Sequence, residues 1–167
     1  MNIENMQDLF VEQIQDLYDA EQRLTKALPE MAEAAASSEL RRAFEEHHGE
    51  TQGHVSRLER IFEGMGLSPK ATTCDAMKGL IKEGETIVSD IKQSALRDAG
   101  LIAAANRVEH YEIAAYGSAK TFARNLGMER AVMMLEETLE EEKNADQKLT
   151  QLAESMINSE ALQTQLR

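Results

Sequence analysis

Polar side chains interrupt the apolar face of the helix predicted between Phe44 and Phe62. At about 100° per residue, His47, Glu50 and His54 stack one turn apart, on that face or at its edge. A buried carboxylate without a partner is costly, so it takes up a proton or is paired with cations or a metal ion. The segment therefore has the side chains of a metal site, if other parts of the chain supply further ligands.

The same helical-wheel argument finds inward-facing acids in three other segments. They are Glu21, Glu109 with Glu112, and Glu142 with Asp146. Each segment has its acids near the middle of a predicted helix, and an antiparallel bundle can bring them to one level. In di-iron and di-manganese bundles, two helices each supply one Glu and the other two supply a paired motif. The pattern therefore predicts a dinuclear centre with these ligands: Glu21, His47, Glu50, His54, Glu109, Glu112, Glu142 and Asp146.

The donor types indicate which metals the site would hold. Oxygen donors with one or two imidazoles favour two Fe or Mn ions, with zinc as an alternative. Carboxylates that bridge two cations would also remove the repulsion among the inward-facing acids. Cys74 is the only cysteine, which excludes an intrachain disulfide and a cysteine-based zinc site.

The spacing leaves the choice among these ligands open. A strict Glu-x-x-His motif occurs at Glu45 and His48. Glu45 points about 160° away from His47, however, so this motif is predicted to face outward. On the inward face, the alternatives that remain open are Glu109 or Glu112, and His47 or His54.

Neighbouring polar residues have simpler predicted roles. Glu141 lies about 100° from Glu142 and is predicted to be solvated. Tyr18 and Tyr116 lie a turn away from the inward-facing acids and could donate hydrogen bonds to ligating carboxylates, although packing is the favoured interpretation. His110 is predicted to face a boundary between helices.

The composition favours an almost purely helical protein, because its 167 residues include only two prolines, nine glycines and 4% aromatic residues. Pro29 is predicted to kink or break the first helix near residue 28, with residues 29–36 as a second helical piece. The last ten residues are predicted to fray. Apolar periodicity predicts helices at about 4–28, 38–64, 94–125 and 128–157, and a crossover helix at about 75–91.

Four long helices joined by a short, a long and a short connection predict an all-α four-helix bundle of the crossover type. The length is typical of one domain, spanning residues 1–167. The two halves of the sequence also resemble each other weakly. Laying Glu21 over Glu112 superposes their apolar positions, which predicts that these two acids occupy equivalent places.

The net charge of −12 opposes binding to nucleic acid and to anionic lipids, and no large Lys/Arg cluster reverses it locally. No apolar run is long enough to cross a bilayer. The N-terminus has neither the basic start nor the apolar core of a signal peptide. We therefore expect a cytoplasmic protein that binds neither nucleic acid nor membranes.

Each long helix contains a stretch that can be compared with known families: DLYDAEQRLTKALPEMA, HHGETQGHVSRLERIFE, LIAAANRVEHYEIAAYG and LEETLEEEKNADQKLT. Together these stretches resemble the YciE/YciF family of bacterial ferritin-like stress proteins, in order and over nearly the whole chain. The resemblance implies a ferritin-like, rubrerythrin-like bundle that forms a cytoplasmic homodimer. It also implies a dinuclear metal site at Glu21, His47, Glu50, Glu112 and Glu142.

Three functional hypotheses follow. The first is a dinuclear Fe or Mn centre that oxidises Fe(II) or reduces a small oxidant such as peroxide or oxygen. The second is a non-catalytic metal-binding protein of the same fold. The third is a metal-free, dimeric helical stress protein in which a polar layer fixes the helix register. Replacing Glu50 and Glu142 by Gln separates the third from the others, because a register layer tolerates an isostere that still forms hydrogen bonds.

Overall fold

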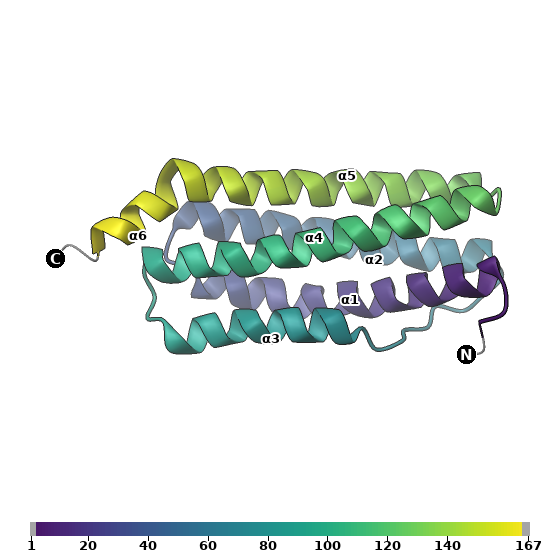
Figure 1. The fold of residues 1–167 in the computed structure, drawn as a ribbon, viewed down its shortest axis with the longest axis horizontal. Helices are drawn as coiled ribbons and strands as arrows, with labels where there is room; N and C mark the ends of the chain where they lie inside the picture. The colour runs from purple at the N-terminus through teal and green to yellow at the C-terminus, as the bar shows by residue number, and fades with distance from the viewer. Residues whose placement is uncertain (1–2, 165–167) are drawn as a thin grey trace.

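The computed structural model describes residues 3–164, which form an antiparallel bundle of four long helices (Figure 1). These helices are α1 (Met6–Ala34), α2 (Ser38–Gly64), α4 (Ala95–Asn125) and α5 (Glu129–Leu152). The long connection from α2 to α4 contains α3 (Asp75–Asp90), which packs on α1 and α4. The predicted all-α, ferritin-like bundle with a crossover helix is confirmed.

Local sequence signals explain most of the helix ends. The side chains of Asn5, Ser37 and Ser94 each accept a hydrogen bond from a backbone N–H three residues later, which caps α1, α2 and α4. After α2 and α4, Gly66 and Gly127 adopt φ angles of 71° and 70°. Side chains disfavour such angles, so these glycines end their helices where the sequence predicts.

The predicted break at Pro29 is wrong, because α1 continues through this residue to Ala34. A proline inside a helix removes one backbone hydrogen bond and crowds the preceding turn. Here Pro29 lies on the exposed side of the helix, while Leu28 and Ala32 are buried at 3% and 4% exposure. Packing on the buried side therefore holds the helix together across the proline.

The last long helix also ends differently from the prediction. α5 stops at Leu152, and a π-helix (Ala153–Ile157) leads into α6 (Asn158–Thr164), which packs against α4. Ile157 and Ala161 are only 1% and 7% exposed. The described part of the tail that was predicted to fray is therefore a packed helix.

Three hydrogen bonds attach the connection before α3 to α1, and one of them runs from the Thr72 hydroxyl to the side-chain oxygen of Gln15 at 3.1 Å. The backbone N–H of Thr72 donates to the carbonyl of Gln15 at 3.1 Å. The backbone N–H of Cys74 donates to the carboxylate of Asp19 at 2.8 Å. The crossover thus starts from a fixed point beside the bundle.

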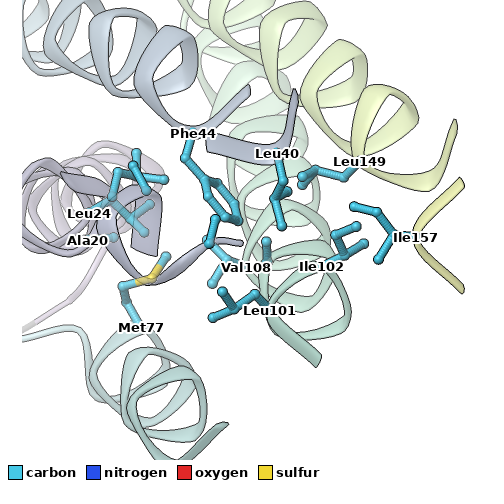
Figure 2. Packing of buried hydrophobic residues seen from close by; sticks show 14 of the residues in the cluster. Ala20, Leu24, Leu40, Phe44, Met77, Leu101, Ile102, Val108, Leu149 and Ile157 are labelled. Atoms are coloured by element: carbon cyan, nitrogen blue, oxygen red, sulfur yellow. The ribbon is translucent and has the colours of Figure 1, made fainter. Parts of the chain in front are cut away.

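The interior contains two apolar clusters. The Leu101 cluster comprises Ala20, Leu24, Leu28, Ala32, Ala35, Leu40, Phe44, Cys74, Met77, Leu101, Ile102, Ala105, Val108, Leu149 and Ile157. Figure 2 shows part of it, with side chains of the bundle meeting Met77 of α3. The Phe62 cluster comprises Phe10, Ile14, Leu17, Tyr18, Leu58, Ile61, Phe62, Tyr116, Ala119, Ala123, Ala131, Leu135 and Leu139. Within residues 3–164, no helix combines the length and apolar character of a membrane span.

Candidate metal centre

Six buried ionisable side chains lie between the Leu101 and Phe62 clusters, and we call them the polar layer. They are Glu21 of α1, His47 and His54 of α2, Glu109 and Glu112 of α4, and Glu142 of α5. On each helix, residues of one apolar cluster precede the layer and residues of the other follow it. Helical periodicity therefore forces these polar groups inward together with their apolar neighbours.

One half of the polar layer is centred on His54. Its Nδ1 atom lies 3.2 Å from Oε1 of Glu21 and 3.0 Å from Oε1 of Glu142. The ligand atoms of these three residues all lie within 4.8 Å of one another. The hydroxyl of Tyr116 donates a hydrogen bond to Glu21 from the side of the Phe62 cluster. This half thus brings donor atoms from three helices to a spacing suited to one ion.

The other half is centred on His47. Its Nε2 atom lies 3.3 Å from Oε1 of Glu109 and 3.3 Å from Oε2 of Glu142. Glu112 completes a set of four residues whose ligand atoms lie within 4.8 Å of one another. This half can hold a second ion with three carboxylates and one imidazole.

Glu142 belongs to both halves. Its Oε1 faces His54 and its Oε2 faces His47, so its two oxygens point to different imidazoles. A carboxylate in this position can bridge two cations. Glu21 and Glu112, which the weak internal repeat predicts to be equivalent, lie in opposite halves.

Each histidine also contacts a carboxylate outside the polar layer. His47 Nδ1 lies 2.9 Å from Glu50 Oε2, and His54 Nε2 lies 2.9 Å from Glu141 Oε2. An imidazole that donates its outer N–H to a carboxylate presents its inner nitrogen as a lone pair. This is the usual arrangement around a metal-binding histidine, where the outer carboxylate fixes the tautomer and the ring orientation.

An arginine holds Glu141 in place. Arg57 donates to both oxygens of Glu141, at 2.5 and 2.9 Å. The same guanidinium donates to Glu137 at 2.7 Å and to Thr138 at 3.1 Å. The outer support of His54 is therefore part of a charged network between α2 and α5, whereas Glu50, the support of His47, is 43% exposed.

Burial raises the pKa of Glu21, Glu109 and Glu112 above the ordinary value for a Glu carboxyl. For Glu112, the carboxylates of Glu142, Glu21 and Glu109 raise the pKa further. These three acids are thus harder to ionise than acids in water unless a cation is present.

Burial lowers the pKa of both histidines, but neighbouring carboxylates more than offset it. Contacts with Glu142 and Glu21 raise the pKa of His54 to about 10. Glu109, Glu142 and Glu50 raise the pKa of His47 well above its ordinary value. Burial favours the neutral form of Glu142, yet His47 and His54 outweigh it and lower its pKa. In the metal-free layer, protons therefore supply positive charge that metal ions could replace.

The polar layer also contains unpartnered atoms. Among the described residues, the buried side-chain nitrogen and oxygen atoms without a hydrogen bond all belong to this layer, apart from Thr51 Oγ1. Both oxygens of Glu112 and both oxygens of Glu142 are among them. Buried polar atoms in folded proteins are nearly always paired, so this concentration indicates a set of donors for a ligand.

Two of the eight predicted ligands lie outside the polar layer. Glu50 is exposed, because it sits about 60° around the helix from His47, whereas Thr51 lies about 40° to the other side and is buried. Asp146 is one turn beyond Glu142, where its carboxylate accepts a hydrogen bond from Asn106 at 2.6 Å. The structure brings together the other six predicted ligands.

Other predicted roles are partly corrected. Glu141 is not simply solvated, since it contacts His54 and Arg57. Sequence spacing misses this contact because it joins two helices. Arg57, three residues after His54, was the one sequence feature that could have indicated an acidic partner nearby. Tyr116 donates to Glu21 as considered above, whereas Tyr18 donates to Glu59 instead.

Comparisons with a family model, with a curated protein and with solved structures all point to the same family. A family model described as a domain of unknown function (DUF892) matches residues 5–162. Protein YciF of Escherichia coli (strain K12) is 43% identical over 162 residues, which span 96% of this chain and 98% of YciF. Its crystal structure, described as that of a stress protein, matches with a TM-score of 0.89 at 43% identity, over 93% of this chain and 99% of that chain.

Two further solved structures share the fold. YcfI of Rhodopseudomonas palustris, described as a proposed structural protein, is 40% identical and matches with a TM-score of 0.87, over 89% of this chain and 95% of that chain. A protein of Xanthomonas campestris is 20% identical and matches with a TM-score of 0.76, over 96% of this chain and 99% of that chain. The bundle is thus retained where most of the sequence has changed.

Proposed function

This chain belongs to the DUF892 family of YciF-like proteins, and from its polar layer we propose that it holds two Fe or Mn ions in a dinuclear carboxylate centre. The observation that carries the proposal is the position of Glu142. Its two oxygens face the inner nitrogens of two different histidines, and both oxygens lack hydrogen bonds. One ion would be held by Glu21, His54 and Glu142, and the other by His47, Glu109, Glu112 and Glu142.

The donor set fits such ions in type and in charge. It consists of four carboxylates and two imidazoles, which suit Fe or Mn. The four negative charges would balance two divalent cations, so burial would leave no net charge in the layer. Two Fe or Mn ions bound there would supply the redox chemistry, taking electrons from Fe(II) or another reductant and passing them to peroxide or oxygen.

The protein's own side chains would position and shield the centre. Glu50 and Glu141 hold the two imidazole rings with the inner nitrogens directed at the layer. The Leu101 and Phe62 clusters cover it at both ends along the bundle and exclude water from those two directions. Tyr116 supports Glu21 by a hydrogen bond that also fixes the carboxylate's orientation.

The rival hypotheses share the fold and differ in chemistry. A metal-binding protein without turnover would load the same two ions but would not consume peroxide or oxygen. A metal-free register layer would pair its buried carboxyl groups with one another through bound protons, and it would take up no metal ion. The homodimer and the physiological oxidant stay predictions.

The first experiment measures metal content by elemental mass spectrometry after anaerobic reconstitution with Fe(II) or Mn(II). We expect about two ions per chain, as in other dinuclear carboxylate bundles. Glu142→Gln should lose at least one ion. Glu140→Gln is the matched control, because Glu140 lies two residues earlier on the same helix, is 56% exposed and pairs with Lys143. Metal at background level in the unaltered protein would overturn the proposal.

A second measurement separates the catalytic from the non-catalytic form. The loaded protein is mixed with hydrogen peroxide or with oxygenated buffer and a reductant, and loss of the oxidant is followed. Consumption that depends on metal and disappears in Glu142→Gln supports a redox centre. Full metal content without consumption would leave a metal-binding protein.

A further inference from the structure

An opening lies beside the His47 half of the polar layer, between α2 and α5. It has a volume of about 160 Å³. Its lining includes Phe44, Glu46, His47, Glu50, Glu109 and Lys148. His47 and Glu109 are 6% and 2% exposed, and each contributes an unpartnered atom, His47 Nε2 and Glu109 Oε2. The opening therefore reaches buried donor atoms of the candidate centre.

The His54 half is closed by comparison. Its three members, Glu21, His54 and Glu142, are all 0% exposed. The outer nitrogen of His54 is covered by Glu141, which Arg57 holds in place. An ion bound in this half would have to arrive through the interior, past the shared Glu142.

Charges at the opening suit a cation. Glu46 and Glu50 of α2 lie at the outer part of the opening, and the buried Glu109 of α4 lies at the inner part of the opening. Lys148 of α5 reaches across to pair with Glu46 of α2. Both partners are largely exposed, at 51% and 63%, and exposed ion pairs of this kind are weak enough to open readily. A lysine paired in this way competes with an incoming cation for the outer carboxylates.

We infer that divalent cations reach the candidate centre through this opening, past Glu50 and Glu109, and that the Glu46–Lys148 pair limits their passage. The inference rests on the proposed metal centre. The His47 half loads first and exchanges its ion first, and the closed His54 half loads through it. Lys148 thus sets the rate of loading without belonging to the ligand set.

The test follows uptake of Co(II) by the metal-free, full-length protein in a stopped-flow spectrometer, and its release to a chelator. Lys148→Ala removes the competing charge, so we expect uptake and release to become about fivefold faster, with unchanged final content. Lys143→Ala is the matched control, because Lys143 is also on α5 and 47% exposed but pairs with Glu140 on its own helix. It should load at the rate of the unaltered protein.

A second variant changes the rate in the opposite direction. Ala145 lines the opening, so Ala145→Leu should narrow it and slow both uptake and release. If Lys148→Ala, Lys143→Ala and the unaltered protein all bind two Co(II) and take them up and release them at equal rates, the proposed passage is overturned and the metal centre stands. Absence of Co(II) binding in all of them would overturn the metal centre, and the passage with it.

Discussion

The Leu101 cluster and the polar layer are neighbours in the same bundle, and both are removed from water. Leu101 and Glu112 lie on the same helix and are each 0% exposed. Leu101 belongs to an apolar cluster, whereas Glu112 has two oxygens without hydrogen bonds. Burial stabilises the first residue and destabilises the ionised form of the second.

This difference separates two roles that a buried residue can have. The apolar cluster is complete as the chain folds, so its contribution to stability does not depend on anything added. The polar layer is complete only when protons or cations neutralise its acids. Its contribution should therefore change with metal and with pH, while that of the cluster should not.

The largest effect is expected from Leu101→Ala. The substitution removes a fully buried side chain and leaves a cavity, so the free energy of unfolding should fall by about 3 kcal/mol. Urea denaturation with and without metal would measure it, and the loss should be the same in both conditions. Leu96→Ala, on the same helix but 43% exposed, should cost less than about 0.5 kcal/mol. If metal restored the stability that Leu101→Ala loses, the cluster would depend on metal as the polar layer does, and the distinction between them would be wrong.

Glu112→Gln should give the opposite result. Since Glu112 favours its protonated form, a neutral isostere should change the stability of the metal-free protein by less than about 1 kcal/mol. The stabilisation by metal, about 2.7 kcal/mol at a concentration 100 times the dissociation constant, should be largely lost. Thermal denaturation at several Mn(II) concentrations would show this. If Mn(II) stabilised Glu112→Gln as much as the unaltered protein, Glu112 would be excluded as a ligand.

The pH dependence of the metal-free protein should reflect the same layer. The pKa values of Glu21, Glu109 and Glu112 are raised on folding, and that of His54 rises to about 10. The folded chain therefore binds more protons than the unfolded chain above the ordinary Glu pKa. Stability should fall as the pH rises, by about 2 kcal/mol between pH 6 and 9.

Urea denaturation in EDTA at the two pH values would measure this fall. The pKa of Glu142 is lowered, so its contribution to the stability is lost only as the pH falls below the ordinary Glu pKa, outside this range. Saturating Mn(II) should remove or reverse the slope, because metal binding displaces protons. A metal-free protein whose stability rises from pH 6 to pH 9 would contradict the protonated layer.

Helical periodicity was sufficient to predict most of the polar layer. A residue in the centre of an apolar face has little freedom, because apolar neighbours one turn away on both sides carry it inward. This applies to Glu21, His54 and Glu142, whose spacing from Leu24, Leu58 and Leu139 places them inside. The fold follows from the same periodicity together with helix caps and two glycine turns.

Residues at the edge of a face and contacts between helices could not be predicted in this way. A rotation of about 60° separates Glu50 from His47, and the packing of neighbouring helices decides whether such a position is exposed. The contact of His54 with Glu141 depends on the relative register of α2 and α5, which a single helical wheel does not contain. Pro29 shows the same limit, because tertiary packing outweighs a local helix-breaking signal.

The smallest effect is expected at these edge positions, where Glu50→Gln and Glu141→Gln weaken the outer support of the histidines. Glu50 is exposed, so Glu50→Gln should lower Mn(II) affinity by about tenfold with the ion count unchanged. Glu141→Gln should cost more, because Arg57 also loses one of its two anionic partners and keeps only Glu137. Calorimetric titration would compare them with Glu45→Gln, an exposed change on α2. Loss of a whole ion in Glu50→Gln would instead make Glu50 a ligand, as the sequence alone predicts, and would require its side chain to turn inward when metal binds.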